Sequence, residues 1–300
     1  MPSLRSRFCR LLIKYLVAKK FNPNKTIDEI RRGAESLTKL TGFPSQTRVE
    51  KIQLNNISAE WVFANEARED RAILYLHGGG YNFCSPNTHR ALSAYISMAS
   101  RAKVLLLDYH LAPEHRFPAA LEDATLTYRW LLKNGFSDKN IALAGDSAGG
   151  GLAIATSVSL RDDGNPPPSS IACISPWTDL TMSGDSIKSH AVIDPMLNLQ
   201  SMILMASNYI GENDPCNPLI SPIYAKLEGL PPTLIHVGSD EMLLDDSRRM
   251  AEKAKGAGVD VTLKIYDKMW HVWHLNAKLM PEAKNAVKEF GSYIRKHFVN

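Results

Sequence analysis

The sequence has few cysteines and little net charge, and it contains no long apolar run. Its 4 cysteines are scattered and form no C-x-x-C pair, so they predict neither a disulfide framework nor a redox motif. A reducing compartment is the simpler interpretation, and a cytoplasmic location is expected. No segment is apolar for long enough to cross a bilayer, and Lys14 interrupts the one N-terminal apolar stretch that a signal peptide would need.

The sequence also lacks the patterns that bind nucleic acids, metals and phosphates. The formal net charge is only +4, and the body of the chain has no basic patch interleaved with aromatic residues, so we expect no nucleic-acid partner. There is no H-E-x-x-H motif or Cys/His cluster, and no Gly-Lys-Ser/Thr follows a glycine cluster. We therefore expect neither a metal nor a cofactor.

The most informative pattern that is present is G-x-S-x-G at residues 145–149. An apolar run, 141–144, precedes it, and apolar residues at helical spacing follow it, which is typical of a strand, a sharp turn and a helix. Such a turn raises the Ser147 hydroxyl above the end of a parallel sheet, where N–H groups at the start of the helix favour negative charge. Ser147 is therefore the predicted nucleophile.

A glycine-rich loop lies upstream of this serine. The loop, His77-Gly78-Gly79-Gly80, follows the strand-like run 72–76. Three glycines leave the backbone unshielded, so that its amides can point into a cavity. We predict an oxyanion hole formed by the N–H groups of Gly79, Gly80 and Ala148.

Strand and helix patterns alternate along most of the chain. Two alternating segments, 48–54 and 57–63, predict strands joined by a turn at residues 55–56. Further strands are predicted near 72–77, 103–107, 141–145, 170–175, 232–237 and 261–266, and helices near 88–99, 119–133, 148–161, 242–255 and 275–297. This order indicates an α/β protein with a mostly parallel sheet that is flanked by helices on both faces.

Four segments in this order resemble the hormone-sensitive-lipase-like group of α/β-hydrolases. They are HGGG (77–80), DYHLAPEH (108–115), FPAA (117–120) and GDSAGG (145–150), and segments 175–180 and 238–241 are similar as well. The resemblance extends from about residue 48 to the C-terminus and implies an α/β-hydrolase fold with a helical lid and a serine esterase of lipid metabolism. Two positions depart from the pattern and can reshape the pocket wall: His110 stands where arginine is common, and Cys84 where glycine is common.

The remaining catalytic residues are expected downstream of the serine, in the order acid and then histidine. His271 follows the last predicted strand and is the predicted base, whereas His274, three residues later, is expected to pack inside the fold. Asp240 follows the strand near 232–237 and is the predicted acid, with Asp267 as the alternative. Asp245 and Asp246 are expected to face solvent or to pair with arginines in the same helix. Asp108, Glu114 and His115 are expected to brace the glycine loop.

Two segments outside the alternation are expected to cover the site. Residues 1–45 are predicted to form lid helices with a break at 22–24, and residues 46–300 form the catalytic domain, which carries a lid insertion at 184–222. Thr26 and Glu29 match a capping box. The first helix has one apolar face, made of Phe8, Leu11, Leu12, Tyr15 and Leu16. This face suits either a lid or a helix lying on a membrane surface; the resemblance favours the lid, so membrane association is not expected.

The expected function is hydrolysis of short- to medium-chain carboxylic esters or lactones, which are small-molecule substrates, through an acyl-serine intermediate. Amide or peptide hydrolysis on the same scaffold is one alternative. A non-catalytic small-molecule receptor of the same fold is another, although the presence of Ser147, Asp240 and His271 argues against it. Strand 261–266 is expected to lie last in the sheet, where it either pairs with a second copy in a homodimer or is kept unpaired by Lys264.

Overall fold

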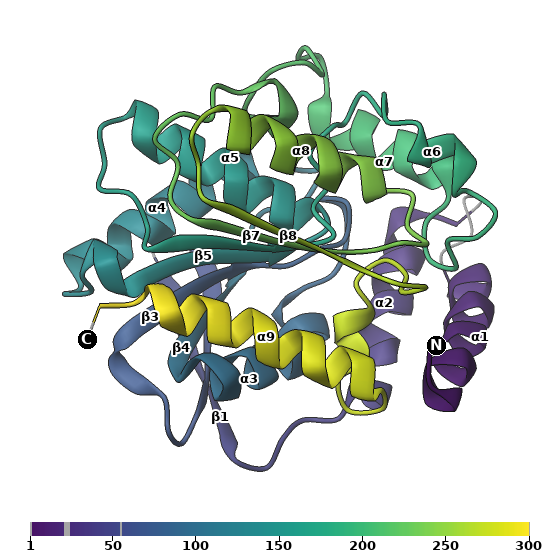
Figure 1. Ribbon diagram of the computed structural model, residues 1–300, viewed down its shortest axis with the longest axis horizontal. Helices are drawn as coiled ribbons and strands as arrows, with labels where there is room; N and C mark the ends of the chain where they lie inside the picture. Colours follow the sequence, from purple (N-terminus) through teal and green to yellow (C-terminus); the bar gives the residue numbers. More distant parts are fainter. Residues whose placement is uncertain (1, 21–24, 55, 300) are drawn as a thin grey trace.

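A computed structural model describes residues 2–20, 25–54 and 56–299 (Figure 1). Its centre is an 8-stranded sheet in the order β1-β2-β4-β3-β5-β6-β7-β8. The pairs β1–β2 and β2–β4 are antiparallel, and all later pairs are parallel. The strands are β1 (Thr47–Leu54), β2 (Ile57–Ala64), β3 (Arg68–Leu76), β4 (Ala102–Asp108), β5 (Ile141–Asp146), β6 (Ser170–Ile174), β7 (Thr233–Gly238) and β8 (Val261–Tyr266).

Helices cover both faces of this sheet, as the alternation of patterns predicts. One face packs against α3 (Pro86–Ser100) and α9 (Pro281–His297), and the other against α4 (Ala119–Lys133), α5 (Ala148–Asp162) and α8 (Leu244–Gly256). Figure 1 shows these two layers above and below the strands. The central strands β5 and β6 are mostly apolar and fully buried because both of their faces are covered.

The predicted elements are confirmed with small changes at their ends. The helix expected over 275–297 is divided into a short 3₁₀ turn, η3 (Trp273–Asn276), and α9, because Pro281 has no N–H to continue a helix and favours the first helical turn. Strand 261–266 is an edge strand, as predicted. The expected break at 22–24 lies outside the described residues, and so does Asn55 of the expected turn.

The N-terminal segment forms α1 (Leu4–Lys20) and α2 (Ile27–Thr41). The capping box at Thr26 and Glu29 is present, with each residue bonding to the backbone N–H of the other. The insertion holds α6 (Ser186–Ser189) and α7 (Leu199–Ile210) and leads to the short turn η2 (Pro222–Tyr224). No helix in the described ranges has both the length and the apolar character that a transmembrane segment requires.

The predicted apolar face of α1 is divided in two. Leu12 and Leu16 line a cavity beneath the helix, whereas Phe8, Leu11 and Tyr15 point outward and are more than half exposed. The sequence prediction merged these two sets because both fall within a wide arc of the same helix. The residues that face inward also include Cys9, Ile13 and Val17.

Candidate active site

Ser147 occupies a sharp turn between β5 and α5. Its backbone has φ 53° and ψ −125°, a strained conformation for a residue with a side chain. The turn is held by the bond from Ser147 N–H to the Ile174 carbonyl, 2.9 Å. A Cβ at Gly145 or at Gly149 would collide with main-chain oxygens, that of Gly149 in the first case and that of Leu76 in the second. The glycines of G-x-S-x-G are therefore required by this close approach of backbones.

His271 lies between the serine and a buried carboxylate. Its Nε2 is 2.9 Å from Ser147 Oγ, and its Nδ1 is 3.0 Å from Glu241 Oε2. All three side chains are buried. The serine, the imidazole and the carboxylate thus form one hydrogen-bonded line, with residues supplied by the loops that follow β5, β7 and β8.

The prediction of Asp240 as the partner of the histidine is wrong in this structure. Glu241, one residue later, holds that position, and Asp240 turns outward to an ion pair with Arg10 of α1. The loop after β7 turns sharply, because Gly238 N–H donates to Glu241 Oε1 and Asp240 N–H donates to the Met269 carbonyl. Because its side chain is longer than that of an aspartate, Glu241 reaches back over the end of the sheet. The alternative, Asp267, is exposed.

One signal in the sequence pointed to Glu241. The run Met242-Leu243-Leu244 follows it directly and is buried, so the chain is already entering the core at residue 241. A carboxylate that orients a buried imidazole must itself be buried and supplied with hydrogen-bond donors. Glu241 receives these from His271, from Gly238 N–H and from the Ser175 hydroxyl, which lies 2.7 Å away.

The environment of His271 shifts its proton affinity. Burial disfavours the charged ring, but the hydrogen bond and the negative charge of Glu241 outweigh burial and raise the pKa of His271 above its ordinary value. His274 packs within the fold, as predicted, where burial and the neighbouring His236 hold its pKa well below the usual range. His271 is therefore the histidine that can exchange a proton with Ser147.

The glycine loop faces the serine. Gly79 and Gly80 line the same cavity as Ser147 and have φ values of +115° and +59°, which favour glycine. Ala148 begins α5, so its N–H has no acceptor within that helix. In the described part of the chain, no protein acceptor takes the N–H of Gly79 or of Gly80. Gly79 and Gly80 thus share the cavity with Ser147, and Ala148 is its neighbour in the chain.

The loop is braced by residues other than those predicted. Asp146, just before the nucleophile, accepts from Gly78 N–H at 3.1 Å and from the Tyr75 hydroxyl at 2.9 Å. The predicted braces do not bond to the loop: Asp108 and His115 are exposed, and Glu114 acts only through Arg31 of α2. Arg31 in turn donates to the carbonyl of Asn82 at 2.9 Å, next to the glycines.

Asp246 also departs from its prediction. Asp245 lies 3.7 Å from Arg248, as expected, but Asp246 is fully buried and accepts from the N–H groups of Thr178 and Asp179 at 2.8 and 2.9 Å. Burial raises the pKa of Asp246 to about 7. Its role is to hold the loop after β6.

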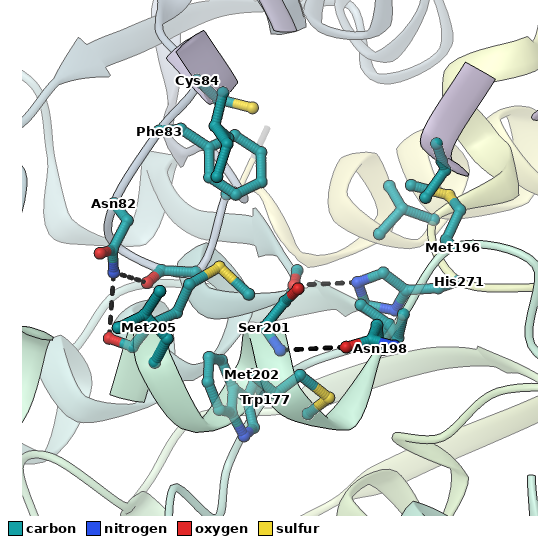
Figure 2. Close-up of a pocket in the computed structure, with 18 of the residues that line it drawn as sticks. Asn82, Phe83, Cys84, Trp177, Met196, Asn198, Ser201, Met202, Met205 and His271 are labelled. Carbon is teal, nitrogen blue, oxygen red and sulfur yellow. Dashed lines mark hydrogen bonds between the residues drawn. The ribbon is translucent and has the colours of Figure 1, made fainter. Parts of the chain in front are cut away.

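A mainly apolar cavity of about 180 Å³ opens onto Ser147 and His271. Figure 2 shows His271 at one side and side chains of α7, among them Met202 and Met205, along another. Residues of α1 and α2 complete the wall, including Val17 and Ile30. The described residues hold no cluster of three ligand-type side chains suited to a metal ion.

A second apolar chamber of about 190 Å³ adjoins the first, beneath α1 and α2. Both chambers are lined by Phe83 and Cys84. The unusual Cys84 therefore does form part of the wall, and its φ of +73° explains why glycine suits this position. His110, the other departure, instead bonds to Asp123 at 2.7 Å and does not line either chamber.

Known proteins with similar sequences include esterases and acetyl-hydrolases. Residues 73–275 match the family described as alpha/beta hydrolase fold. An acetyl-hydrolase of Streptomyces hygroscopicus is 44% identical over 245 residues, which are 81% of each chain. An esterase of Acinetobacter venetianus is 33% identical over 95% of this chain and 94% of its own.

Solved structures agree with this relationship. A crystal structure of an esterase from the bacterial hormone-sensitive lipase family has a TM-score of 0.96 and 42% identity, with 100% of both chains covered. A crystal structure of EstE5 soaked with p-nitrophenyl butyrate has a TM-score of 0.93 and 44% identity, over 98% of this chain and 99% of that one. The chain therefore belongs to the hormone-sensitive-lipase-like esterases of the α/β-hydrolase fold, and it is a serine carboxylesterase/lipase-like hydrolase.

Proposed function

We propose that the protein hydrolyses carboxylic esters through an acyl-serine intermediate formed on Ser147. The observation that carries this proposal is the unbroken hydrogen-bonded line from Ser147 through His271 to Glu241. A serine hydroxyl is a weak nucleophile at neutral pH unless a neighbouring base accepts its proton. His271 is the only base in contact with it in the described part of the chain.

In the first half-reaction, Ser147 Oγ attacks the ester carbonyl carbon while its proton passes to His271 Nε2. The carbonyl oxygen becomes negative and accepts hydrogen bonds from the amides of Gly79, Gly80 and Ala148, whose removal one at a time typically costs about 3 kcal/mol of transition-state stabilisation. Glu241 holds the ring in one tautomer and stabilises its cation. The C–O bond then breaks, and the alcohol leaves with the proton from His271.

In the second half-reaction, water attacks the acyl-serine, with His271 as the base. The acid is released and the Ser147 hydroxyl is restored. The same residues serve both halves, so no cofactor enters the proposed scheme.

The proposed substrates are esters of short to medium chain length, or lactones. The cavity around Ser147 is mainly apolar, and its walls include Trp177, Met202 and Met205, which suit an aliphatic chain. We also propose that residues 1–45 and 184–222 act as the lid, since α1, α2 and α7 supply cavity wall.

Hydrolysis of p-nitrophenyl esters from acetate to dodecanoate tests this proposal. We expect a maximum at butyrate to octanoate and no turnover by Ser147→Ala, which keeps the fold because alanine fits the turn. An organophosphate should add its mass to the peptide containing Ser147 and to no other. Wild-type turnover by folded Ser147→Ala would refute the mechanism, and a rate that keeps rising with chain length would refute only the substrate range.

A further inference from the structure

Helix α1 has two apolar faces on opposite sides. The inner face, which includes Cys9, Ile13 and Val17, lines the chamber beneath the helix. The outer face is a continuous stripe at helical spacing, formed by Leu4, Phe8, Leu11 and Tyr15, whose side chains are 81%, 65%, 70% and 63% exposed. We call these four residues the outer stripe. A surface helix that only covered a cavity would be polar on this side.

The charged residues of α1 that flank the outer stripe are cations. Arg5 lies on one flank, and Arg7 and Lys14 lie on the other, and all three are exposed. The chain has no acid before Asp28, so every formal side-chain charge of α1 is positive. Arg10, the fourth cation in this part of the helix, is already paired with Asp240.

The insertion carries further exposed apolar side chains close to α1. Arg10 Nη2 donates to the Ile193 carbonyl at 2.6 Å, which fixes the insertion beside the helix. There Val192 is 88% exposed and Ile193 is also exposed. Figure 1 shows α1 at the periphery of the molecule, on the side of the sheet where α2 and the insertion lie.

We propose that the outer stripe and its basic flanks dock the protein on an anionic lipid surface. Exposed apolar side chains enter the boundary between headgroups and acyl chains, while arginine and lysine extend their charged ends to lipid phosphates. Charge complementarity favours this occupant over a second copy of the chain, because two copies meeting at this stripe would bring like charges together. This reverses the expectation from sequence, which assigned the whole apolar face to the lid.

Docking in this way places a lipid surface on one side of α1 and the substrate chamber on the other. Esters dissolved in the lipid would then be concentrated next to the helix that covers the chambers. The docking itself does not require the proposed chemistry, so binding and hydrolysis can be tested separately.

Sedimentation with vesicles tests the proposal. One set is made of phosphatidylcholine alone, and the other of phosphatidylcholine and phosphatidylglycerol in equal parts. We expect the full chain to bind the anionic vesicles and to be released by high salt, because the attraction to headgroups is screened. Leu11→Ser and Lys14→Glu should each weaken the partition coefficient about tenfold, through lost burial and reversed charge respectively.

Matched controls lie on α4, on another part of the surface. Leu126→Ser and Lys133→Glu change an exposed leucine and an exposed lysine there and should bind as the wild type does. None of these four residues lines either chamber, so turnover of soluble p-nitrophenyl butyrate should be unchanged in every variant.

Three results would overturn the proposal. They are equal binding to both kinds of vesicle, equal loss of binding in the α1 and α4 variants, and failure of the wild type to bind the anionic vesicles. A dimer that Leu11→Ser dissociates in light scattering would assign the stripe to a second copy instead. Loss of ester hydrolysis in all proteins, with lipid binding intact, would refute the proposed function and leave the docking surface standing.

Discussion

The guanidinium of Arg10 lies 2.6 Å from the carboxylate of Asp240, which ties the first helix of the chain to the residue before Glu241. The same guanidinium donates to the carbonyl of Lys268 at 3.3 Å, in the loop that leads to His271, and to that of Ile193. One side chain from α1 therefore joins the acid loop, the histidine loop and the lid insertion.

We predict that Arg10→Gln lowers kcat/KM for p-nitrophenyl butyrate about tenfold while the fold stays intact. The ion pair is partly exposed, so its loss should cost only about 1 kcal/mol of stability. The main effect is on catalysis, because the loops that carry Glu241 and His271 lose the side chain that joins them. Arg7→Gln, an exposed arginine on the same helix, is the control. Equal kinetics of the two variants would show that the anchor has no role in catalysis.

Glu241→Gln and Asp240→Asn should separate the two adjacent acids. A comparable amide substitution in a serine protease lowers turnover by about four orders of magnitude, because the histidine is held in the wrong tautomer. We expect a loss of this order for Glu241→Gln and at most about tenfold for Asp240→Asn, which breaks only the link to Arg10. Steady-state kinetics and circular dichroism on both variants check this. The opposite order of losses in folded proteins would restore Asp240 as the acid.

The rate should rise with pH through the titration of His271. The ring accepts the serine proton only when it is neutral, and Glu241 raises the pKa of His271. The acidic limb of kcat/KM should therefore lie at higher pH than for an unperturbed histidine, with a plateau on the alkaline side. In Glu241→Gln the largest cause of the increase is gone, while burial and the weaker effects of Asp194 and Asp146 remain, so the limb should move to lower pH. If the acidic limb of Glu241→Gln stays at the wild-type pH, Glu241 is not the carboxylate that raises the pKa of His271.

Two glycines should respond in opposite ways to alanine. Gly149→Ala should destabilise the protein by about 3 kcal/mol, because its Cβ would collide with the carbonyl oxygens of Leu76 and His77. Gly256→Ala should stabilise it by about 0.5–1 kcal/mol, since nothing lies within 4 Å of that Cβ and alanine restricts the unfolded chain. Urea unfolding of both variants gives the comparison. A neutral Gly149→Ala would show that the strand and helix can separate at the turn.

The free edge of β8 predicts a homodimer. Lys264 is paired with Glu289 of its own chain at 2.7 Å, and Ile265 is 43% exposed. A lysine on an edge strand hinders pairing with another strand, but Lys264 is held by an ion pair within its own chain. The edge is therefore open to pairing with a symmetry-related copy. Light scattering should show a dimer that Ile265→Lys dissociates. A monomer at high concentration would reject this interface.

The sequence by itself identified the parts of the site that depend on neighbours along the chain. Ser147 was found because its turn needs glycines on both sides, and His271 because it follows the last strand at the end where the serine stands. The strands were found because central parallel strands are apolar on both faces. Each of these signals lies within a few residues of the feature that it predicts.

The apolar run that follows Glu241 favours this residue, but only the tertiary structure decides between Asp240 and Glu241. Both follow β7, and the choice depends on how the loop turns, which is determined by Met269 in the next loop and by Asp194 in the lid insertion. Asp240 N–H donates to the carbonyl of Met269, and Met242 N–H donates to the carboxylate of Asp194. These partners lie 29 and 48 residues away along the chain, so no local pattern records them.

The sequence prediction of a single apolar face on α1 fails for the same reason. Helical periodicity shows which residues share a side of a helix, but it does not show which side meets the rest of the molecule. The contact of Arg10 with three distant loops settles the rotation of α1, and with it which apolar residues line the chamber and which stay exposed. Local chemistry thus identified the nucleophile and the base, whereas long-range hydrogen bonds selected the acid and oriented α1.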